Sequence, residues 1–219
     1  MATGRYIIVD DHPLFRGALR QALSVAFKTA DIEEVGSLPE LMATLAVSTD
    51  VDLVLLDLAM PGVQGLSGLL LLRREHPEVP VIVVSATDDS ATIRRCIEFG
   101  ASGYVPKSQP VEHIRDAVRA VMSGEVWVPA DVMVGGAESN GDRELAGRLS
   151  ALTPQQMRVL MMLGEGLLNK QIAFKLGVSE ATIKAHVSAI LTKLRVDSRT
   201  QAVIAISKIG MGAWPQASD

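Results

Sequence analysis

The sequence has almost none of the features that mark a disulfide-stabilised secreted protein or a membrane-spanning one. Its 219 residues include one cysteine, Cys96, so no internal disulfide can form. No stretch approaches the ~20 consecutive apolar residues that a membrane helix needs, because runs such as Val51–Leu56 are broken by an aspartate. The N-terminus also lacks a basic segment followed by a long apolar one, so no secretory signal is expected. The cytoplasm is therefore the expected compartment, with no membrane partner.

Aromatic residues are also scarce, at 4% of the chain, whereas apolar residues make up 48% and suffice for a substantial core. The net charge of −4 is divided unevenly. Ser150–Asp219 contains eight Lys or Arg and four Asp or Glu, and the preceding 149 residues contain 13 and 21. An acidic front and a basic back indicate two parts with different partners.

The first 125 residues alternate between two patterns. Short runs rich in β-branched residues occur at Tyr6–Val9, Asp31–Val35, Leu53–Leu56, Val81–Val84 and Ser102–Val105. Helix-length segments with a 3.6-residue apolar period follow them at Leu14–Phe27, Leu38–Val47, Gly65–Glu75, Ser90–Phe99 and Val111–Met122. Five strands that alternate with five helices predict an α/β domain at 1–125, a doubly wound five-stranded parallel sheet with helices on both faces.

The alternation ends after about residue 125. The stretches Gly135-Gly136 and Ser139-Asn140-Gly141-Asp142 have turn and linker chemistry. Residues 126–149 are therefore expected to connect two domains. Beyond them the chain shows clear helix start signals, and we predict an all-α domain of four helices at 150–219.

The start signals of this second domain are capping residues. Thr153-Pro154-Gln155-Gln156 combines an N-cap threonine, proline at the first helical position and glutamine at the third. Asn169 is expected to cap a short second helix and Ser179 a longer third one, and Ser198-Arg199-Thr200-Gln201 opens the last. Only Gly177-Val178 separates the second and third helices, which is a tight turn of helix-turn-helix type.

Acidic residues stand at the ends of two predicted strands. Asp10 and Asp11 follow the first strand and Asp57 follows the third. In an open parallel sheet, ligands bind outside the carboxyl ends of the strands, where the order of winding switches. Three carboxylates at one edge repel one another, and a hard divalent cation such as Mg²⁺, which takes oxygen ligands, relieves that repulsion. The pattern therefore favours a magnesium site.

A hydroxyl and an ammonium group are expected at the same edge. Ser85 ends the fourth strand and Lys107 follows the fifth, so both can bind the oxygens of a phosphoryl group on Asp57. A carboxylate nucleophile, a metal and a fixed cation together suit phosphoryl transfer. Taken singly, Asp10-Asp11 also fits a helix cap and Lys107 a solvated surface lysine; their joint placement at four strand ends favours the site.

Residues 1–125 resemble the receiver domain of two-component response regulators, which has a flavodoxin-like fold. The matching stretches are Val9-Asp10-Asp11-His12-Pro13, Asp57-Leu58-Ala59-Met60-Pro61-Gly62, Val84-Ser85-Ala86 and Gly100-Ala101-Ser102-Gly103-Tyr104-Val105-Pro106-Lys107. The resemblance implies that Asp57 accepts phosphate from a histidine kinase. It implies that Asp11, Asp57 and the carbonyl of Ala59 bind Mg²⁺, with Asp10 acting through water. It also implies that Lys107 binds the phosphoryl group, while the Ser85 hydroxyl moves toward it and the Tyr104 ring rotates inward.

The predicted helix that begins at Glu180 has two unlike faces. One carries an apolar stripe of Ile183, Val187, Ile190, Leu191 and Leu194. The other carries small residues, hydroxyls and cations: Ala181, Lys184, Ala185, Ser188, Thr192 and Arg195. An ordinary exposed helix is the alternative, but such helices usually mix both charge signs, whereas a face that approaches DNA avoids carboxylates.

Further groups near this helix fit a phosphate backbone. Lys170, Lys193, Arg195 and Arg199 can neutralise phosphates, and the helix start capped by Ser179 can present backbone N–H groups to one.

Residues 150–210 resemble the LuxR-type, or NarL-type, helix-turn-helix. The matches include Leu152-Thr153-Pro154, Gly164-Glu165-Gly166, Asn169-Lys170-Gln171-Ile172-Ala173, Leu176-Gly177-Val178-Ser179 and Thr182-Ile183-Lys184-Ala185-His186. The resemblance implies that Glu180–Leu194 is a recognition helix for double-stranded promoter DNA. The implied base contacts are Lys184, Ala185 and Ser188, and the implied phosphate contacts are mainly Thr182, Lys193, Arg195 and Arg199. The last helix would pair two chains through Val203, Ile206 and Ile209.

Some positions depart from these families. Many receivers place proline directly after the lysine, but here Pro106 precedes Lys107, which bears on the geometry of that loop. In the second domain Gln156 replaces the usual glutamate, Leu168 stands where serine is frequent, and Ser188 is shorter than the long polar residue often found there. These three bear on target sequence and affinity.

The leading hypothesis is that phosphorylation of Asp57 reorders the region around Ser85 and Tyr104 and changes the receiver face formed by the fourth helix, fifth strand and fifth helix. Release of the basic domain, dimerisation into a homodimer, or both would then permit DNA binding. One alternative is a receiver that serves only to dimerise, which the intact site argues against. Another is a Mg²⁺-dependent enzyme such as a phosphatase, which would need a general acid–base that Leu58 and Ala59 do not supply. No enzyme activity beyond slow self-dephosphorylation is expected.

Overall fold

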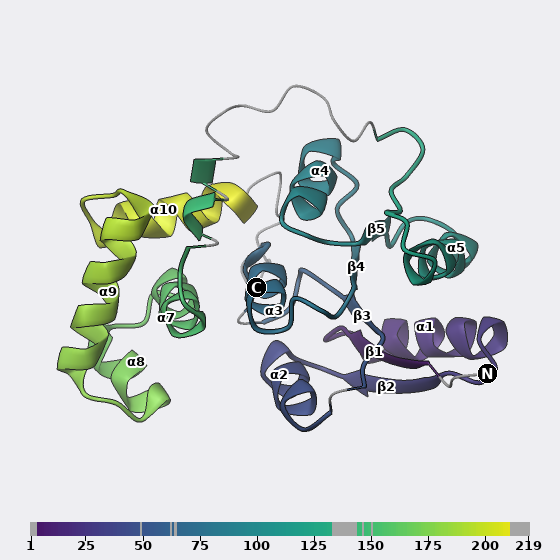
Figure 1. Ribbon diagram of the computed structural model, residues 1–219, viewed down its shortest axis with the longest axis horizontal. Coiled ribbons are helices and arrows are strands. Elements are labelled where there is room, and N and C mark those ends of the chain that lie inside the picture. The colour runs from purple at the N-terminus through teal and green to yellow at the C-terminus, as the bar shows by residue number, and fades with distance from the viewer. Residues whose placement is uncertain are drawn as a thin grey trace.

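The structure is a computed structural model that describes residues 4–48, 50–61, 63, 65–132, 144–145, 147–149 and 151–210, the last five without their side chains. The described part of the chain forms an α/β domain and a helical domain that lie side by side (Figure 1). Within it, no helix has the length and apolar character needed to span a membrane.

The α/β domain is built on five strands that pair in parallel, in the order β2-β1-β3-β4-β5. Their bounds are β1 (Arg5–Val9), β2 (Asp31–Val35), β3 (Leu53–Leu56), β4 (Val81–Ser85) and β5 (Gly103–Pro106). Every residue of β3 and β4 is buried, because these interior strands are covered on both faces. The predicted doubly wound sheet is confirmed, with strand ends within one residue of those expected.

Five helices cover the two faces of the sheet: α1 (Pro13–Ala26), α2 (Leu38–Val47), α3 (Ser67–Glu75), α4 (Ser90–Glu98) and α5 (Val111–Met122). Alternate strand residues divide between them. Ile8 and Leu55 point into a cluster with α1 and α5, while Ile7 and Val54 point into a cluster with α2, α3 and α4. This arrangement places the carboxyl ends of β1, β3, β4 and β5 together at one edge.

The second domain has the four predicted helices, α7 (Pro154–Gly164), α8 (Asn169–Leu176), α9 (Glu180–Leu194) and α10 (Arg199–Gly210). The Thr153–Gln156 capping box is present in full. The chain leaves α8 through Gly177 at φ 65°, a left-handed conformation that glycine adopts without steric cost. The expected Asn169 cap is wrong: Leu168 occupies that position, and its backbone N–H donates to the Gln171 side chain.

The segment between the domains is held at both of its described ends. Trp127 adds a bridge to β5, since the Tyr104 N–H donates to its carbonyl at 2.9 Å. At the other end, Leu149 is fully buried and Arg148 donates to the carbonyl of Leu194. The linker stretches Gly135-Gly136 and Ser139-Asn140-Gly141-Asp142 lie outside the described residues, so the expected linker of 126–149 stays a prediction.

Candidate functional site

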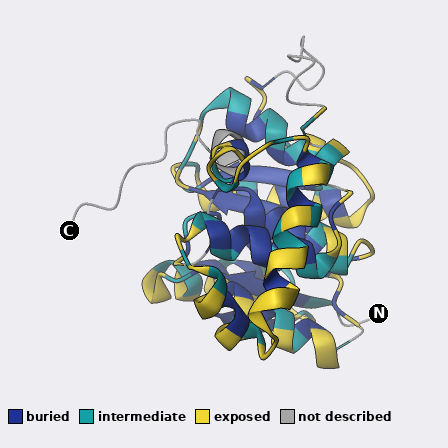
Figure 2. Ribbon diagram, turned by 90° about the vertical axis from the view of Figure 1, so that its left-hand side faces the viewer, coloured by how far each residue is buried: buried dark blue, intermediate teal, exposed yellow. Residues whose placement is uncertain are grey.

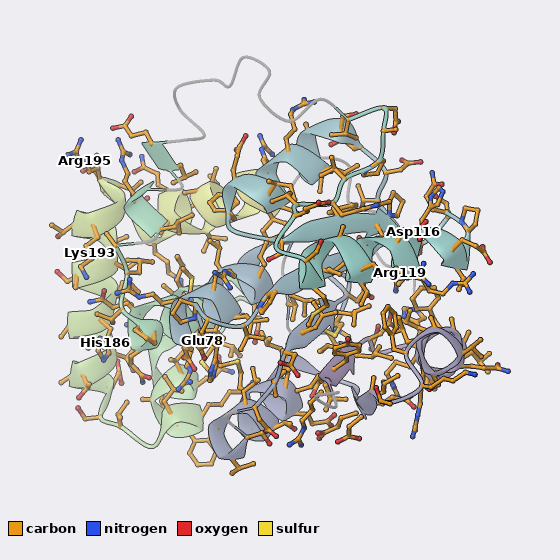
Figure 3. All side chains as sticks on the ribbon, turned by 45° about the vertical axis from the view of Figure 1, so that its right-hand side comes forward. Glu78, Asp116, Arg119, His186, Lys193 and Arg195 are labelled. Carbon is orange, nitrogen blue, oxygen red and sulfur yellow. The ribbon has the colours of Figure 1, made fainter. Side chains whose placement is uncertain are left out.

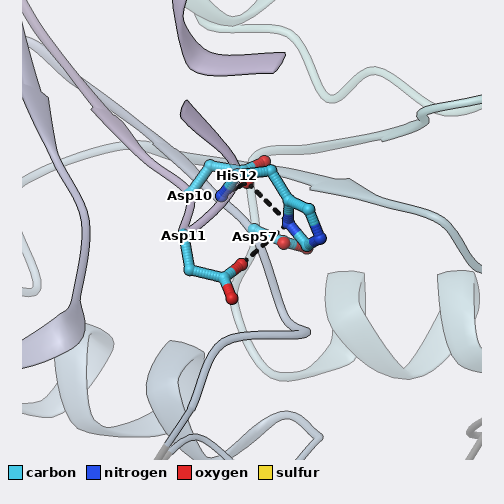
Figure 4. Close-up of side chains that lie close together, drawn as sticks. All are labelled: Asp10, Asp11, His12 and Asp57. Atoms are coloured by element: carbon cyan, nitrogen blue, oxygen red, sulfur yellow. Dashed lines mark hydrogen bonds and ion pairs between the residues drawn. The ribbon is translucent and has the colours of Figure 1, made fainter. Parts of the chain in front are cut away.

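Three carboxylates meet at the sheet edge (Figure 4). Asp10 and Asp11 follow β1 and Asp57 follows β3, and with His12 each offers one ligand atom within 4.8 Å of the others. Asp10 and Asp57 are almost completely buried. The β1–β3 pairing produces this approach, because the Asp57 N–H donates to the carbonyl of Val9 and continues the ladder past both strand ends.

Lys107 lies between two of these carboxylates. Its Nζ is 2.6 Å from Oδ2 of Asp10 and 2.8 Å from Oδ2 of Asp57, and it lies 4.6 Å from the centre of the Phe15 ring. Pro106 continues β5 opposite Ser85, and the Lys107 N–H donates to the Ser85 carbonyl at 2.7 Å. The unusual proline before the lysine is thus compatible with a lysine that reaches the carboxylates.

Burial and ion pairing have opposite effects on the pKa values of Asp57 and Lys107. Burial raises the pKa of Asp57 above that of an ordinary aspartate, although the hydrogen bond and charge of Lys107 oppose the rise. Burial alone would lower the pKa of Lys107, but its hydrogen bonds to Asp10 and Asp57 outweigh that effect and raise the pKa. One ammonium group therefore faces two buried carboxylates, with Asp11 beside them.

The cluster fits a divalent cation. Oδ1 of Asp11 is buried and receives no hydrogen bond, although Nδ1 of His12 lies 2.8 Å away. A buried carboxylate oxygen whose nearest partner is the exposed His12 imidazole, in a group of three acids, is an environment that a hard cation can complete. The other carboxylate oxygen of Asp57, Oδ1, accepts a hydrogen bond from the N–H of Ala59, which holds this residue beside Asp57.

Ser85 and Tyr104 lie near the same edge. Ser85 is fully buried, and its Oγ accepts a hydrogen bond from the Thr87 N–H at 3.4 Å. The Tyr104 ring is also fully buried, and its hydroxyl donates to the Thr87 carbonyl at 2.7 Å. Burial raises the pKa of Tyr104, so the phenol remains a donor. The ring already occupies the inward position that the sequence analysis assigned to the phosphorylated state.

Sequence reasoning gave no role to three neighbours of the site. His12 lies beside the carboxylates, Phe15 contacts Lys107, and Thr87 ties Ser85 to Tyr104. His12 and Thr87 stand in or beside the recognised motifs, so their proximity to the site was available as a signal. Phe15 had no such signal, because its approach depends on how α1 packs.

The predicted reading face of α9 is exposed. Figure 2 shows this helix from its outer side, with exposed turns along its length. Its predicted contacts Lys184, Ala185 and Ser188 are all exposed, whereas Ile183, Ile190 and Leu194 are fully buried against the rest of the domain. Ser179 caps the helix by accepting a hydrogen bond from Thr182. The helix therefore presents small and polar side chains outward.

Two of the predicted phosphate contacts also have partners inside their own domain. Nζ of Lys193 donates to the carbonyl of Ala151 at 2.9 Å and to Oε1 of Gln156 at 2.8 Å. Arg199 donates to the carbonyl of Leu167 at 2.5 Å. Arg195 stands at the end of α9, near Lys193, and its side chain is 73% exposed (Figure 3). Lys193 and Arg199 thus hold the helices together, while Arg195 is mostly exposed and has Oε1 of Glu144 3.5 Å from its guanidinium.

The remaining predicted contacts are placed as follows. Thr182 and Lys170 are exposed, near the starts of α9 and α8. Val203 is half-buried and packs on the core of the domain. The side chains of Ile206 and Ile209 lie outside the described residues.

Comparison with known proteins finds two family models on the chain. Residues 6–119 match the response regulator receiver domain, and residues 150–206 match the bacterial regulatory proteins of the luxR family. The chain is 40% identical to the glycerol metabolism activator of Pseudomonas putida, over 96% of this chain and 98% of the relative. It is 37% identical to the nitrate/nitrite response regulator protein NarP of Escherichia coli, over 90% and 92%.

A solved structure shares the fold. RcsB from Salmonella enterica serovar Typhimurium, bound to a promoter in the presence of phosphomimetic BeF₃⁻, superposes with a TM-score of 0.57 at 23% identity. The match covers 95% of this chain and all of that one.

Proposed function

The chain belongs to the response regulators that join a receiver to a LuxR-family DNA-binding domain, and from this we propose that phosphorylation of Asp57 controls its binding to promoter DNA. The placement of Asp57 supports the proposal: a buried carboxylate held between Lys107 and the Ala59 N–H. The proposed donor is a phosphohistidine on a histidine kinase. A carboxylate oxygen of Asp57 attacks phosphorus, the P–N bond breaks, and the imidazole leaves with the electron pair.

The residues of the site divide this work. Lys107 lies against Oδ2 of Asp57, where it can follow an added phosphoryl oxygen and balance its charge. Asp11, Asp57 and the Ala59 carbonyl would hold Mg²⁺, with Asp10 acting through water. When bound, Mg²⁺ supplies further neutralisation of charge on the phosphoryl oxygens. Ser85 is close enough to the edge for its hydroxyl to turn toward a phosphoryl group, and the Tyr104 ring, already inward, would keep its place.

The proposed output is a homodimer on paired half-sites of double-stranded DNA. Lys184, Ala185 and Ser188 would face bases, and Ser179, Thr182, Lys170, Arg195 and, in part, Lys193 and Arg199 would face phosphates. Val203, Ile206 and Ile209 of α10 would pair two chains. A regulator that binds the chromosome works where the chromosome lies, so the proposed compartment is the cytoplasm.

Intact-mass measurement tests the phosphorylation directly. The protein is incubated with acetyl phosphate and Mg²⁺, beside Asp57→Asn and a control, Asp116→Asn, whose aspartate is exposed on α5. We expect one added phosphate on wild type and on the control, none on Asp57→Asn, and none on any sample in EDTA. An equal adduct on Asp57→Asn would refute the assignment.

DNA binding is tested with a duplex enriched from a random-sequence pool by the phosphorylated protein. Phosphorylated wild type is expected to bind it more tightly than Asp57→Asn treated in the same way, because only wild type can be switched. Equal affinity would exclude control by phosphate. Assaying the same samples with a generic phosphate ester separates the enzyme alternative, which requires steady turnover.

A further inference from the structure

Helix α3 has no exposed side over most of its length. Its residues Ser67–Leu72 are all buried, although a helix that flanks a sheet normally buries one face. Four consecutive leucines, Leu69–Leu72, explain why, because at 100° per residue they point in every direction around the helix. Leu69 and Leu72 are fully buried, and Leu70 and Leu71 are only 7% and 4% exposed. The outer leucines therefore have a cover other than the sheet.

The cover is the DNA-binding domain. Helix α7 lies beside α3 and packs directly on it (Figure 1). One continuous cluster of buried side chains runs from the sheet through α3 into α7. Met161 and Met162 of α7 line the junction opposite Leu71. Arg158 of α7 forms an ion pair with Glu75, at 2.7 Å and 2.8 Å from the two carboxylate oxygens. Glu75 is 14% exposed, so loss of this arginine would leave a largely buried carboxylate unpaired.

The junction also borders the phosphoacceptor loop. A pocket of about 420 Å³ lies between the domains, and Pro61, four residues after Asp57, lines it together with Met162. A change in the Asp57 loop therefore reaches the edge of the DNA-binding domain without any separation of the two domains.

The recognition helix lies on the other side of α7. Helix α9 occupies the outer edge of the molecule, with α7 between it and α3 (Figure 1). Lys184, Ala185 and Ser188 are exposed while the domains are in contact. Separating the domains would expose Leu70 and Leu71 and would uncover no part of the reading face.

We infer that the docked arrangement is itself the DNA-binding form: the DNA-binding domain engages a half-site while α7 stays on α3, and phosphorylation acts on the pairing of two chains. Of the two changes that could permit DNA binding after phosphorylation, dimerisation and release of the basic domain, this arrangement favours dimerisation. It rests on the proposed DNA-binding function and specifies how that function is regulated.

A covalent staple across the junction tests this directly. Pro39 and Glu165 are both exposed and line the interdomain pocket from opposite domains, so Pro39→Cys and Glu165→Cys can be joined with a short bis-maleimide, with closure verified by intact mass. The native Cys96 is fully buried and does not compete for the reagent. The single variants, treated alike, are the controls. The probe is the enriched duplex, measured with phosphorylated protein.

We expect the stapled protein to bind within about twofold of the unstapled double variant, because nothing needs to open. A loss of tenfold or more on stapling, with normal binding by the unstapled protein, would overturn the inference and leave the proposed function intact. Failure of wild type and the unstapled protein alike to bind would instead refute the proposed function, and the inference with it.

A charge swap provides an independent arm. Arg158→Glu and Glu75→Arg each place like charges at the junction, and the double variant restores an ion pair. Both single variants are expected to melt at lower temperature than wild type, with recovery in the double variant, and neither should bind DNA more tightly without phosphate. A tenfold gain in DNA affinity by the unphosphorylated single variants, reversed by the swap, would show an inhibitory clamp and contradict the inference.

Discussion

Replacing Lys107 by methionine probes the centre of the phosphoacceptor site. Methionine keeps the length of the side chain and removes the charge that lies 2.6 Å from Asp10 and 2.8 Å from Asp57. Both carboxylates are almost completely buried and Lys107 is 15% exposed, so solvent replaces little of the lost interaction. Removing one partner of a buried ion pair costs about 3–5 kcal/mol. We expect Lys107→Met to lose stability in that range, measured by urea denaturation in EDTA.

Magnesium should stabilise the Lys107→Met variant more than it stabilises wild type. Without the ammonium group, Mg²⁺ meets three carboxylates that no resident cation neutralises, so it should bind more tightly than in wild type. A ligand at 100 times its Kd stabilises a fold by about 2.7 kcal/mol, and Mg²⁺ should therefore recover much of the loss. The control is Lys28→Met, which removes an exposed lysine of the same domain and should change neither quantity.

The pH dependence of stability tests whether the charge of Lys107 causes the difference between the two proteins. The pKa of Lys107 is raised in the folded protein, so its stabilisation is present at and below the pKa of an unfolded lysine and is lost as pH rises through the higher folded value. The difference in free energy of unfolding between wild type and Lys107→Met should therefore persist from pH 7 to pH 9. If the variant is as stable as wild type in EDTA, the two short contacts carry no net stabilisation and the reasoning fails.

Three further predictions address other parts of the chain. Burial raises the pKa of Asp57, so on acidification the rate of phosphorylation by acetyl phosphate should begin to fall at a higher pH than an ordinary aspartate would give. A midpoint at the pKa of an ordinary aspartate would contradict this. Lys193→Met should lower the free energy of unfolding by about 1–3 kcal/mol through its lost hydrogen bonds and should reduce the salt dependence of DNA binding less than Arg195→Met does, because Lys193 would face phosphates only in part; an equal reduction with unchanged stability would contradict the intradomain role of Lys193. Gly177→Ala should destabilise the helical domain by about 1 kcal/mol in thermal melts, because φ there is 65°; equal melting would contradict that account of the turn.

Much of the fold was predictable because its signals are local. Short apolar runs and amphipathic periods mark each strand and helix of the receiver, and Thr153, Ser179 and Gly177 mark helix ends in the second domain. The cap of α8 was misassigned because Asn169 is a good capping residue in isolation. Here the Gln171 side chain satisfies the N–H of Leu168 and shifts the helix start by one position.

The site was predictable to the level of which residues meet, since parallel strands bring their carboxyl ends to one edge. The partners of individual side chains were not. Lys193 and Arg199 were assigned to phosphates from their charge and from the family resemblance, neither of which indicates that they also donate to the Ala151 and Leu167 carbonyls, which are distant in sequence. The apolar Met161-Met162 pair gives no local sign of its partner, and only the packing shows that it lies between the domains.

The leucines of α3 also restrict how the two domains can be exchanged. Regulators of this type look modular, as if a receiver could be cut at residues 126–149 and joined to another output domain. Here such a chimera would carry Leu70 and Leu71 on its surface unless the new domain offered an adaptable apolar side like that of Met161 and Met162. Recombination of this receiver in evolution, or in the laboratory, therefore has to carry α7 along or replace the outer leucines first.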